Sequence, residues 1–513
     1  MNKNIFKYCL LLFPLVLGSC GHFLEEVSQD EIKPSTVTDL EQLLLGDGYC
    51  NTEAQGSAGN FNAYCITDMF TDDIKCNGVS FTGLQYTYDA YDSQFSWKDE
   101  MFTLEGDGDN IQFWQLPYNG IGTCNVILDH LDKVNGDDVL REHIRGEVLV
   151  LRSWYFLHLV NFFGMPYNYG NPGENLGVPL QLTSGVTEER LYRNTVQEVY
   201  DQILKDMTQG YQLMKQNPVD KNSFRVGPLA AAAMLARVYL YMENWDKAIN
   251  YADTVLRENS VLLDLNNLAR TGDASVVKQL YHSSVYDPAL SDEIIWGRPY
   301  GTSIYLRDVP IEGVAPYSIS DSLQNLLFRG KSWTAIAEQG DVEDCRVIFF
   351  FGWQKRGTIT YIYAPSKGTV PGFATCNNYQ GIRTAEVYLI RAEAYARKNM
   401  ENPNGEYVRK ALVDLNVLRA HRLTAETSGR DLDITEANEL FEAIQVERRL
   451  ELCGETNNRW FDLRRWGMPE IIHMVGARES EMEPAVLTEK QYVLPIPEEA
   501  LNRNGNLVQN IRK

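Results

Sequence analysis

Apolar residues recur every three or four positions through much of the chain, and the pattern is clearest between Ala231 and Leu256. This segment, AAAMLARVYLYMENWDKAINYADTVL, predicts two short amphipathic helices that fold back on each other at Glu243 and Asn244. One such hairpin cannot cover its own apolar face. We therefore expect similar units stacked on each side of it.

The spacing inside this hairpin is that of a tetratricopeptide (TPR) repeat. The positions that carry it are Leu235, Ala236, Tyr239, Trp245, Ala248 and Ala252. Helical periodicity predicts further helices over residues 110–133, 139–163, 196–214, 383–397, 439–454 and 459–467, and a helix around Ala411 and Leu415. Thr195 is placed to cap one of them, and Ser35 or Thr36 to cap a short helix near the N-terminus. The predicted fold is mostly α-helical, with about eight helices in four TPR-like hairpins and a few short strands.

Two long stretches interrupt the helical pattern. Residues 46–109 are rich in Gly, Asn, Asp, Ser and Tyr, and residues 260–381 mix strand-like runs, such as DEIIWG and RVIFFFGW, with aromatic-rich loops. Compact domains keep long irregular segments mainly for function. The predicted organisation is a leader (1–19), a tether and first helix (20–45), a first insertion (46–109), the N-terminal part of a helical scaffold (110–259), a second insertion (260–381), and C-terminal helices with a tail that complete the scaffold (382–513).

The leader has the features of a bacterial export signal. Lys3 and Lys7 precede the uncharged run CLLLFPLVL, which is too short to span a bilayer. The tetrapeptide LGSC that follows resembles a lipobox, in which the thiol of Cys20 receives a diacylglycerol group. We expect a protein held by acyl chains, with a plain secretory leader as the alternative.

Charge and motifs exclude several function classes. The chain carries 69 acidic and 47 basic residues, a formal net charge of −22, which argues against nucleic acid as a partner. The signatures HExxH, GxSxG, GxGxxG and the Walker loop are absent, and EGDGDN lacks the glycine and glutamate spacing of a calcium loop. We expect no metal or cofactor. An enzyme is the least supported class, although carboxylate pairs at glycosidase distance stay open.

The cysteines give no metal-binding pattern either. Beyond Cys20 there are seven, and no two have CxxC spacing. We expect mostly buried free thiols, with one loop disulfide among Cys50, Cys65 and Cys76 as the alternative.

Charged and aromatic residues alternate closely in VERRLELCGETNNRWFDLRRWG, residues 446–467. Charges placed so tightly among Leu, Trp and Phe cannot all reach water, so several must be paired and at least partly buried. Each acidic residue has an arginine nearby. We therefore interpret the cluster as an ion-pair network of the scaffold rather than as a catalytic site.

Three blocks in this order resemble the SusD/RagB family of Bacteroidetes outer-membrane nutrient-binding lipoproteins. They are LRSWYFLHLVNFFGMPYN (151–168), RTAEVYLIRAEAYAR followed by LNVLRAHR, and the block at 446–467 followed by VLPIPEEALNRNGNLVQN. The resemblance covers nearly the whole chain, and one departure from the family pattern is Gly505 with the ending IRK. Glu25 and Glu26 also resemble the acidic signal that sends some of these lipoproteins to the cell surface.

The resemblance implies a non-catalytic, surface-exposed lipoprotein that binds a glycan and partners a SusC-like TonB-dependent transporter. A neutral oligosaccharide offers apolar C–H faces and rims of hydroxyl groups, which suit exposed aromatic rings edged by polar side chains. We place the ligand between the two insertions, and we expect Trp296 in the core instead. The predicted contacts are Trp97, Tyr88, Tyr300 and Trp333 for stacking and Asn110 and Asp73 for hydrogen bonds. Two alternatives stay open: a peptide ligand, as in the RagB branch, or a TPR adaptor for protein partners.

Overall fold

The computed structural model describes residues 34–49, 63–78, 92–103, 112–185, 190–266, 291–300, 317–332, 335–336, 341–356, 359–365, 378–455 and 457–512. Long helices dominate this part of the chain, and the strands form two-stranded ladders. The predicted mostly helical fold is confirmed. The predicted domain boundaries stay a prediction.

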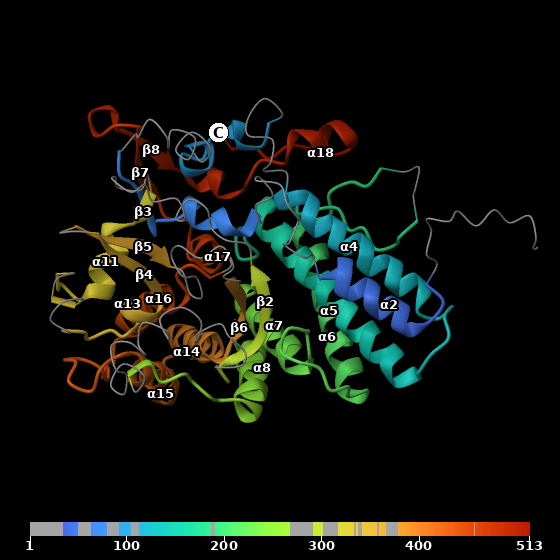
Figure 1. Ribbon diagram of the computed structural model, residues 1–513, viewed down its shortest axis with the longest axis horizontal. Coiled ribbons are helices and arrows are strands. Elements are labelled where there is room, and N and C mark those ends of the chain that lie inside the picture. Colours follow the sequence, from blue (N-terminus) through green and yellow to red (C-terminus); the bar gives the residue numbers. More distant parts are fainter. Residues whose placement is uncertain are drawn as a thin grey trace, which may run out of the picture.

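Helices that follow one another along the chain pack side by side and form a continuous stack (Figure 1). The N-terminal half contains α2 (Val37–Leu43), α4 (Gln112–His130), α5 (Asp138–Phe163), α6 (Val196–Gln216), α7 (Pro228–Tyr241) and α8 (Trp245–Glu258). The C-terminal half contains α14 (Thr384–Glu401), α15 (Gly405–Arg422), α16 (Ala437–Leu452), α17 (Asn458–Arg465) and the short α18 (Glu498–Arg503). α8 packs against α14, so the two halves join although the second insertion separates them in sequence.

Local sequence signals explain where several of these helices begin and end. Thr195 caps α6 in a reciprocal capping box with Glu198, and Thr36 caps α2 in the same way. The chain reverses between α7 and α8 at Glu243, which has a φ of 58°, and Asn244 then caps α8. The predicted hairpin break is therefore confirmed.

The strands form short two-stranded ladders beside the helices. β2 (Ile294–Tyr300) pairs antiparallel with β6 (Asn378–Arg383), and β4 (Phe351–Arg356) pairs with β5 (Ile359–Pro365). β7 (Ile471–Val475) pairs with β8 (Glu483–Leu487). The run RVIFFFGW, predicted as a strand, instead begins with one helical turn, α13 (Arg346–Phe349), before β4. Another short helix, α11 (Asp321–Phe328), lies in the same insertion.

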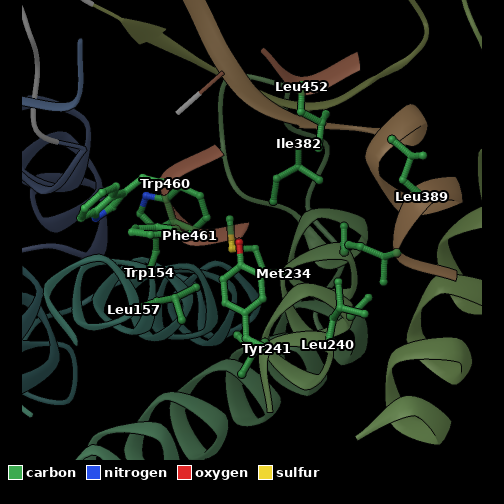
Figure 2. Packing of buried hydrophobic residues seen from close by; sticks show 14 of the residues in the cluster. Trp154, Leu157, Met234, Leu240, Tyr241, Ile382, Leu389, Leu452, Trp460 and Phe461 are labelled. Carbon is green, nitrogen blue, oxygen red and sulfur yellow. The ribbon is translucent and has the colours of Figure 1, made fainter. Parts of the chain in front are cut away.

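Large apolar side chains of α5, α7 and α17 pack together in the buried core (Figure 2). Phe461 contacts Phe162 and Tyr241 with ring centroids 5.2 and 6.3 Å apart. Trp296 of β2 is fully buried, as predicted, and its ring lies edge-on to Trp154 at 5.3 Å. The second insertion therefore contributes to the core of the scaffold.

Four cysteines can be placed, namely Cys76, Cys124, Cys345 and Cys453. All four are buried free thiols, as predicted, so no disulfide forms at Cys76. Burial raises the pKa of the Cys345 thiol to about 12, which makes it unreactive near neutral pH.

The close crossing of α5 and α6 depends on two glycines. A Cβ atom at Gly210 would lie 2.5 Å from the carbonyl oxygen of Gly146 and 2.7 Å from Cγ2 of Val150. We expect Gly210→Ala to lower the free energy of unfolding by about 1–3 kcal/mol, because neither backbone nor Val150 has room to move. Gly122→Ala in α4, which meets nothing within 4 Å, is the matched control and should stabilise the protein by up to about 1 kcal/mol. Chemical denaturation measures both; equal effects would contradict the tight crossing.

Candidate functional site: the junction of the two insertions

The two insertions meet in a short antiparallel ladder. β1 (Ile74–Cys76) of the first pairs with β3 (Tyr317–Ile319) of the second. Next to the ladder, the amide of Ser320 donates to the carbonyl of Asp73 at 2.7 Å. The Ser320 hydroxyl donates to the carbonyl of Asp72 at 2.6 Å. We call this ladder and the residues that hold it the insertion junction.

Two arginines of the scaffold helices hold the junction through ion pairs. Arg449 of α16 donates to Oδ1 of Asp73 at 2.7 Å and to the hydroxyl of Ser322 at 2.9 Å. Arg459 of α17 makes two 2.8 Å hydrogen bonds to the carboxylate of Asp72. Burial works to raise the pKa of Asp72, but Arg459 more than offsets it, so the pKa lies below its ordinary value. The position of the insertions is thus set by charge pairing with α16 and α17.

Asp73, predicted as a ligand contact, is one of these buried anchors. It is 1% exposed, and burial raises the pKa of its carboxyl although Arg449 opposes the rise. The prediction is corrected: the side chain faces the scaffold, because α16 supplies the cation that it needs.

Trp97, predicted as a stacking residue, also lies in the core. Its indole N–H donates to the carbonyl of Phe70 at 3.1 Å, and its ring stacks on His473 of β7 at 4.2 Å. Phe95 stacks on His473 at 4.0 Å, so the imidazole lies between two aromatic rings. Trp97 is fully buried, so this prediction is corrected as well.

His473 was missed by sequence reasoning. Its two ring nitrogens lie 2.8 and 3.0 Å from the carbonyl oxygens of Phe95 and Thr71. The signal that was available is the alternation in IIHMV, where Ile471 and His473 are buried and Ile472 and Met474 are exposed.

The remaining predicted contacts cannot be placed at this junction. Tyr88, Asn110, Trp333 and the lipidation residue Cys20 lie outside the described residues. Tyr300 ends β2 opposite Asn378, and its side chain is likewise outside them. In the part of the chain that the structure describes, no cluster of His, Cys, Asp and Glu is arranged to hold a metal ion.

The root of the second insertion is fastened by a buried ion-pair network centred on Glu451 of α16. Glu451 accepts hydrogen bonds from Arg422 at 2.9 Å, from Arg383 at 3.0 Å and from Arg346 at 3.4 Å. Arg383 and Arg422 also pair with Glu293, which precedes β2. The further members are Asp344, Arg419, Glu447 and Glu455.

A second buried group lies beside it. Asp462 pairs with Arg448 at 2.8 Å and with Arg465, and Arg465 also pairs with Glu393. The ion pairing predicted for residues 446–467 is confirmed. Every carboxylate named here has a guanidinium partner, which fits a structural role.

Two family models match the chain on either side of residues 241–350. A model described as SusD-like and "Starch-binding associating with outer membrane" matches residues 22–240, and a model described as "SusD family" matches residues 351–512. The chain belongs to the SusD/RagB family. In this SusD/RagB chain, the first matched part contains Asp72 and the second contains its partners Arg449 and Arg459. Both sides of the ion pairs that hold the insertion junction therefore lie in matched parts.

Similar proteins agree with this assignment. "SusD-like protein P2" of Formosa agariphila is 25% identical over 437 residues, which cover 80% of this chain and 82% of that protein. A SusD superfamily structure from Bacteroides thetaiotaomicron aligns with a TM-score of 0.70 and 22% identity, covering 93% of this chain and 100% of that one. A "Putative sugar binding protein" structure from Bacteroides vulgatus aligns with a TM-score of 0.67 and 22% identity, covering 94% and 99%. These structures share the SusD fold.

Replacing Glu451 should break the ion-pair network and lower the stability of the protein. Glu451→Gln keeps the shape of the side chain but leaves three buried guanidinium groups without their shared counter-charge. We expect a loss of about 3–5 kcal/mol in the free energy of unfolding. The matched control is Glu406→Gln, which removes an exposed partner of Arg409 and should leave stability unchanged within error. Similar midpoints for both variants in guanidinium chloride would contradict the role of the network.

The same residue predicts a pH dependence. Burial works to raise the pKa of Glu451, but Arg422 and Arg383 together place it below the ordinary value of 4.5. As pH falls the unfolded chain therefore binds this proton first, so the stabilisation is complete above pH 4.5 and is lost below it. The difference in unfolding free energy between the wild type and Glu451→Gln should narrow between pH 5 and about pH 3. A difference that stays constant over this range would contradict the assignment.

Proposed function

We propose that the protein is a non-catalytic, surface-exposed lipoprotein that captures oligosaccharides and delivers them to a SusC-like TonB-dependent transporter. The observation that carries the proposal is the insertion junction. It joins two aromatic-rich segments through β1 and β3 and fixes both on the scaffold, in a chain whose family model is described as starch-binding and associating with the outer membrane. A rigid frame that presents variable loops suits a receptor for an extended ligand.

With Trp97 and Asp73 assigned to the core, the proposed ligand contacts are Tyr88, Tyr300 and Trp333, with Asn110 as a hydrogen-bonding partner. Aromatic rings bind the C–H faces of a sugar, and an amide both donates to and accepts from its hydroxyl groups. Tyr88, Tyr300 and Trp333 belong to the two segments that the junction brings together, and Asn110 directly follows the first of them, which supports a ligand held between the segments.

The anchor in this proposal is the lipid on Cys20. The described helices include none with the length and apolarity needed to cross a bilayer. Acyl chains on a tether would leave the whole scaffold free to cover a transporter at the outer membrane. The strong negative charge of the chain fits a neutral sugar better than an anionic ligand.

Affinity electrophoresis on gels that contain starch, β-glucan or xylan tests the proposal. We expect Tyr300→Ala/Trp333→Ala to weaken retention on the bound polysaccharide by at least about tenfold, because two stacking rings are lost. Tyr169→Ala, which removes an exposed ring outside both insertions, is the control and should migrate like the wild type. Binding to none of the polysaccharides, together with binding to an oligopeptide mixture, would favour the peptide-receptor alternative.

A further inference from the structure

A second concave surface lies well apart from the insertion junction. It is a groove with a cavity volume of about 710 Å³ between α4, the wall segments 179–185 and 190–191, and α18. Figure 1 shows α4 and α18 on the side of the molecule away from β3. The volume falls within the range of about 300–1,000 Å³ that is typical of small-ligand sites.

The groove is preformed where it is described, because hydrogen bonds hold both wall segments, residues 179–185 and residues 190–191. On the α4 side, Tyr118 donates to the carbonyl of Pro179 at 2.8 Å, Asn125 donates to that of Gln181 at 2.9 Å, and Asp129 accepts from the hydroxyl of Ser184 at 2.7 Å. On the C-terminal side, Asn504 donates to the carbonyl of Leu191 at 2.8 Å and Asn506 to that of Arg190 at 2.7 Å. A wall held in this way does not have to order itself when a ligand binds.

The floor combines two rings with two amides. Trp114 and Tyr118 lie one turn apart on α4, with ring centroids 5.1 Å from each other, and both residues are half-buried. Gln115 and Asn119 form the adjacent row, also one turn apart and exposed. Among the described residues, neither of these amides has a hydrogen-bond partner, although both line the groove. The result is an apolar strip beside a row of groups that both donate and accept hydrogen bonds.

This arrangement restricts the ligand. A purely apolar ligand would leave both amides without partners after desolvation, which lowers affinity. Two arginines line the groove, Arg190 and Arg503, but Arg503 is paired with Glu499 on α18 and the whole chain has a formal charge of −22, which disfavours an anion. A pyranose ring matches the floor, because it has an apolar C–H face and hydroxyl groups along its edge.

We propose that this groove is a second binding site, for a neutral di- or trisaccharide, separate from the surface carried by the insertions. Its rings are Trp114 and Tyr118, and its polar contacts are Gln115 and Asn119. The site goes beyond the proposed function because it needs neither insertion, so it can bind a short sugar while the insertions hold a longer chain.

Isothermal titration of the purified full chain with maltotriose, cellotriose, xylotriose and laminaritriose tests the groove. For the trisaccharide that binds, Gln115→Ala/Asn119→Ala should raise the Kd by about tenfold or more, because two sets of hydrogen bonds are lost. The melting temperature should not change, since both side chains are exposed. The control is Gln212→Ala/Gln216→Ala, which removes an exposed amide pair of the same spacing from α6 and should bind like the wild type.

The outcomes separate the groove from the insertions. Binding that survives Tyr300→Ala/Trp333→Ala but falls in Gln115→Ala/Asn119→Ala supports the groove, whether or not polysaccharide is also bound. Trisaccharide binding that is unchanged in the groove variant overturns the groove proposal and leaves the insertion site standing. Binding of no trisaccharide, or of an oligopeptide in its place, overturns the groove as a saccharide site.

Discussion

The burial of Glu451 among three guanidinium groups is the interaction on which the architecture depends. A charge can leave water only when its partners are in place, and the partners of Glu451 come from α13, the end of β6 and the end of α15. α16 can therefore adopt its packed position only after these separate segments have assembled. Glu293 adds the strand that opens the β2–β6 ladder to the same cluster. The network makes the root of the second insertion and the C-terminal helices one cooperative unit.

The first insertion attaches to the same helices at a different point. Arg449 of α16 and Arg459 of α17 hold the Asp72–Asp73 turn, and His473 of β7 fixes Phe95 and Trp97 by stacking. Buried ion pairs and stacked aromatic rings thus hold the bases of both insertions. The frame therefore does not depend on the parts of the insertions beyond these bases, and a site can differ on the same fold.

Much of the frame was predictable because its signals are local. Helical period, the caps at Thr36 and Thr195 and the TPR spacing around Ala236 all act within a few residues, and the structure confirms them. Close interleaving of arginine and acid also predicted that residues 446–467 would be paired. It did not predict the partners, because Arg346 and Arg383 lie about 105 and 68 residues from Glu451 in the chain.

The candidate site was harder to predict, because the residues that decide its structure are also distant in the sequence. Trp97 lies in a segment whose composition is typical of exposed loops, and its burial is decided by a histidine on a strand at the other end of the sequence. Asp73 resembled a free loop carboxylate until Arg449, 376 residues away, was placed beside it. The groove beside α4 gave only a faint signal: two rings and two amides at helical spacing, which are equally typical of an ordinary surface helix.

The ladder between β1 and β3 also constrains how the protein is made. Its strands are separated by more than 240 residues, and the arginines and the histidine that complete the base of the first insertion lie still closer to the C-terminus. As the chain is made from its N-terminus, residues 63–78 and 92–103 stay without these native neighbours until nearly the whole polypeptide has been synthesised. Contacts of such long range are slow to form. The base of the first insertion is therefore among the last parts of the molecule to complete its contacts, although it is among the first parts to be made.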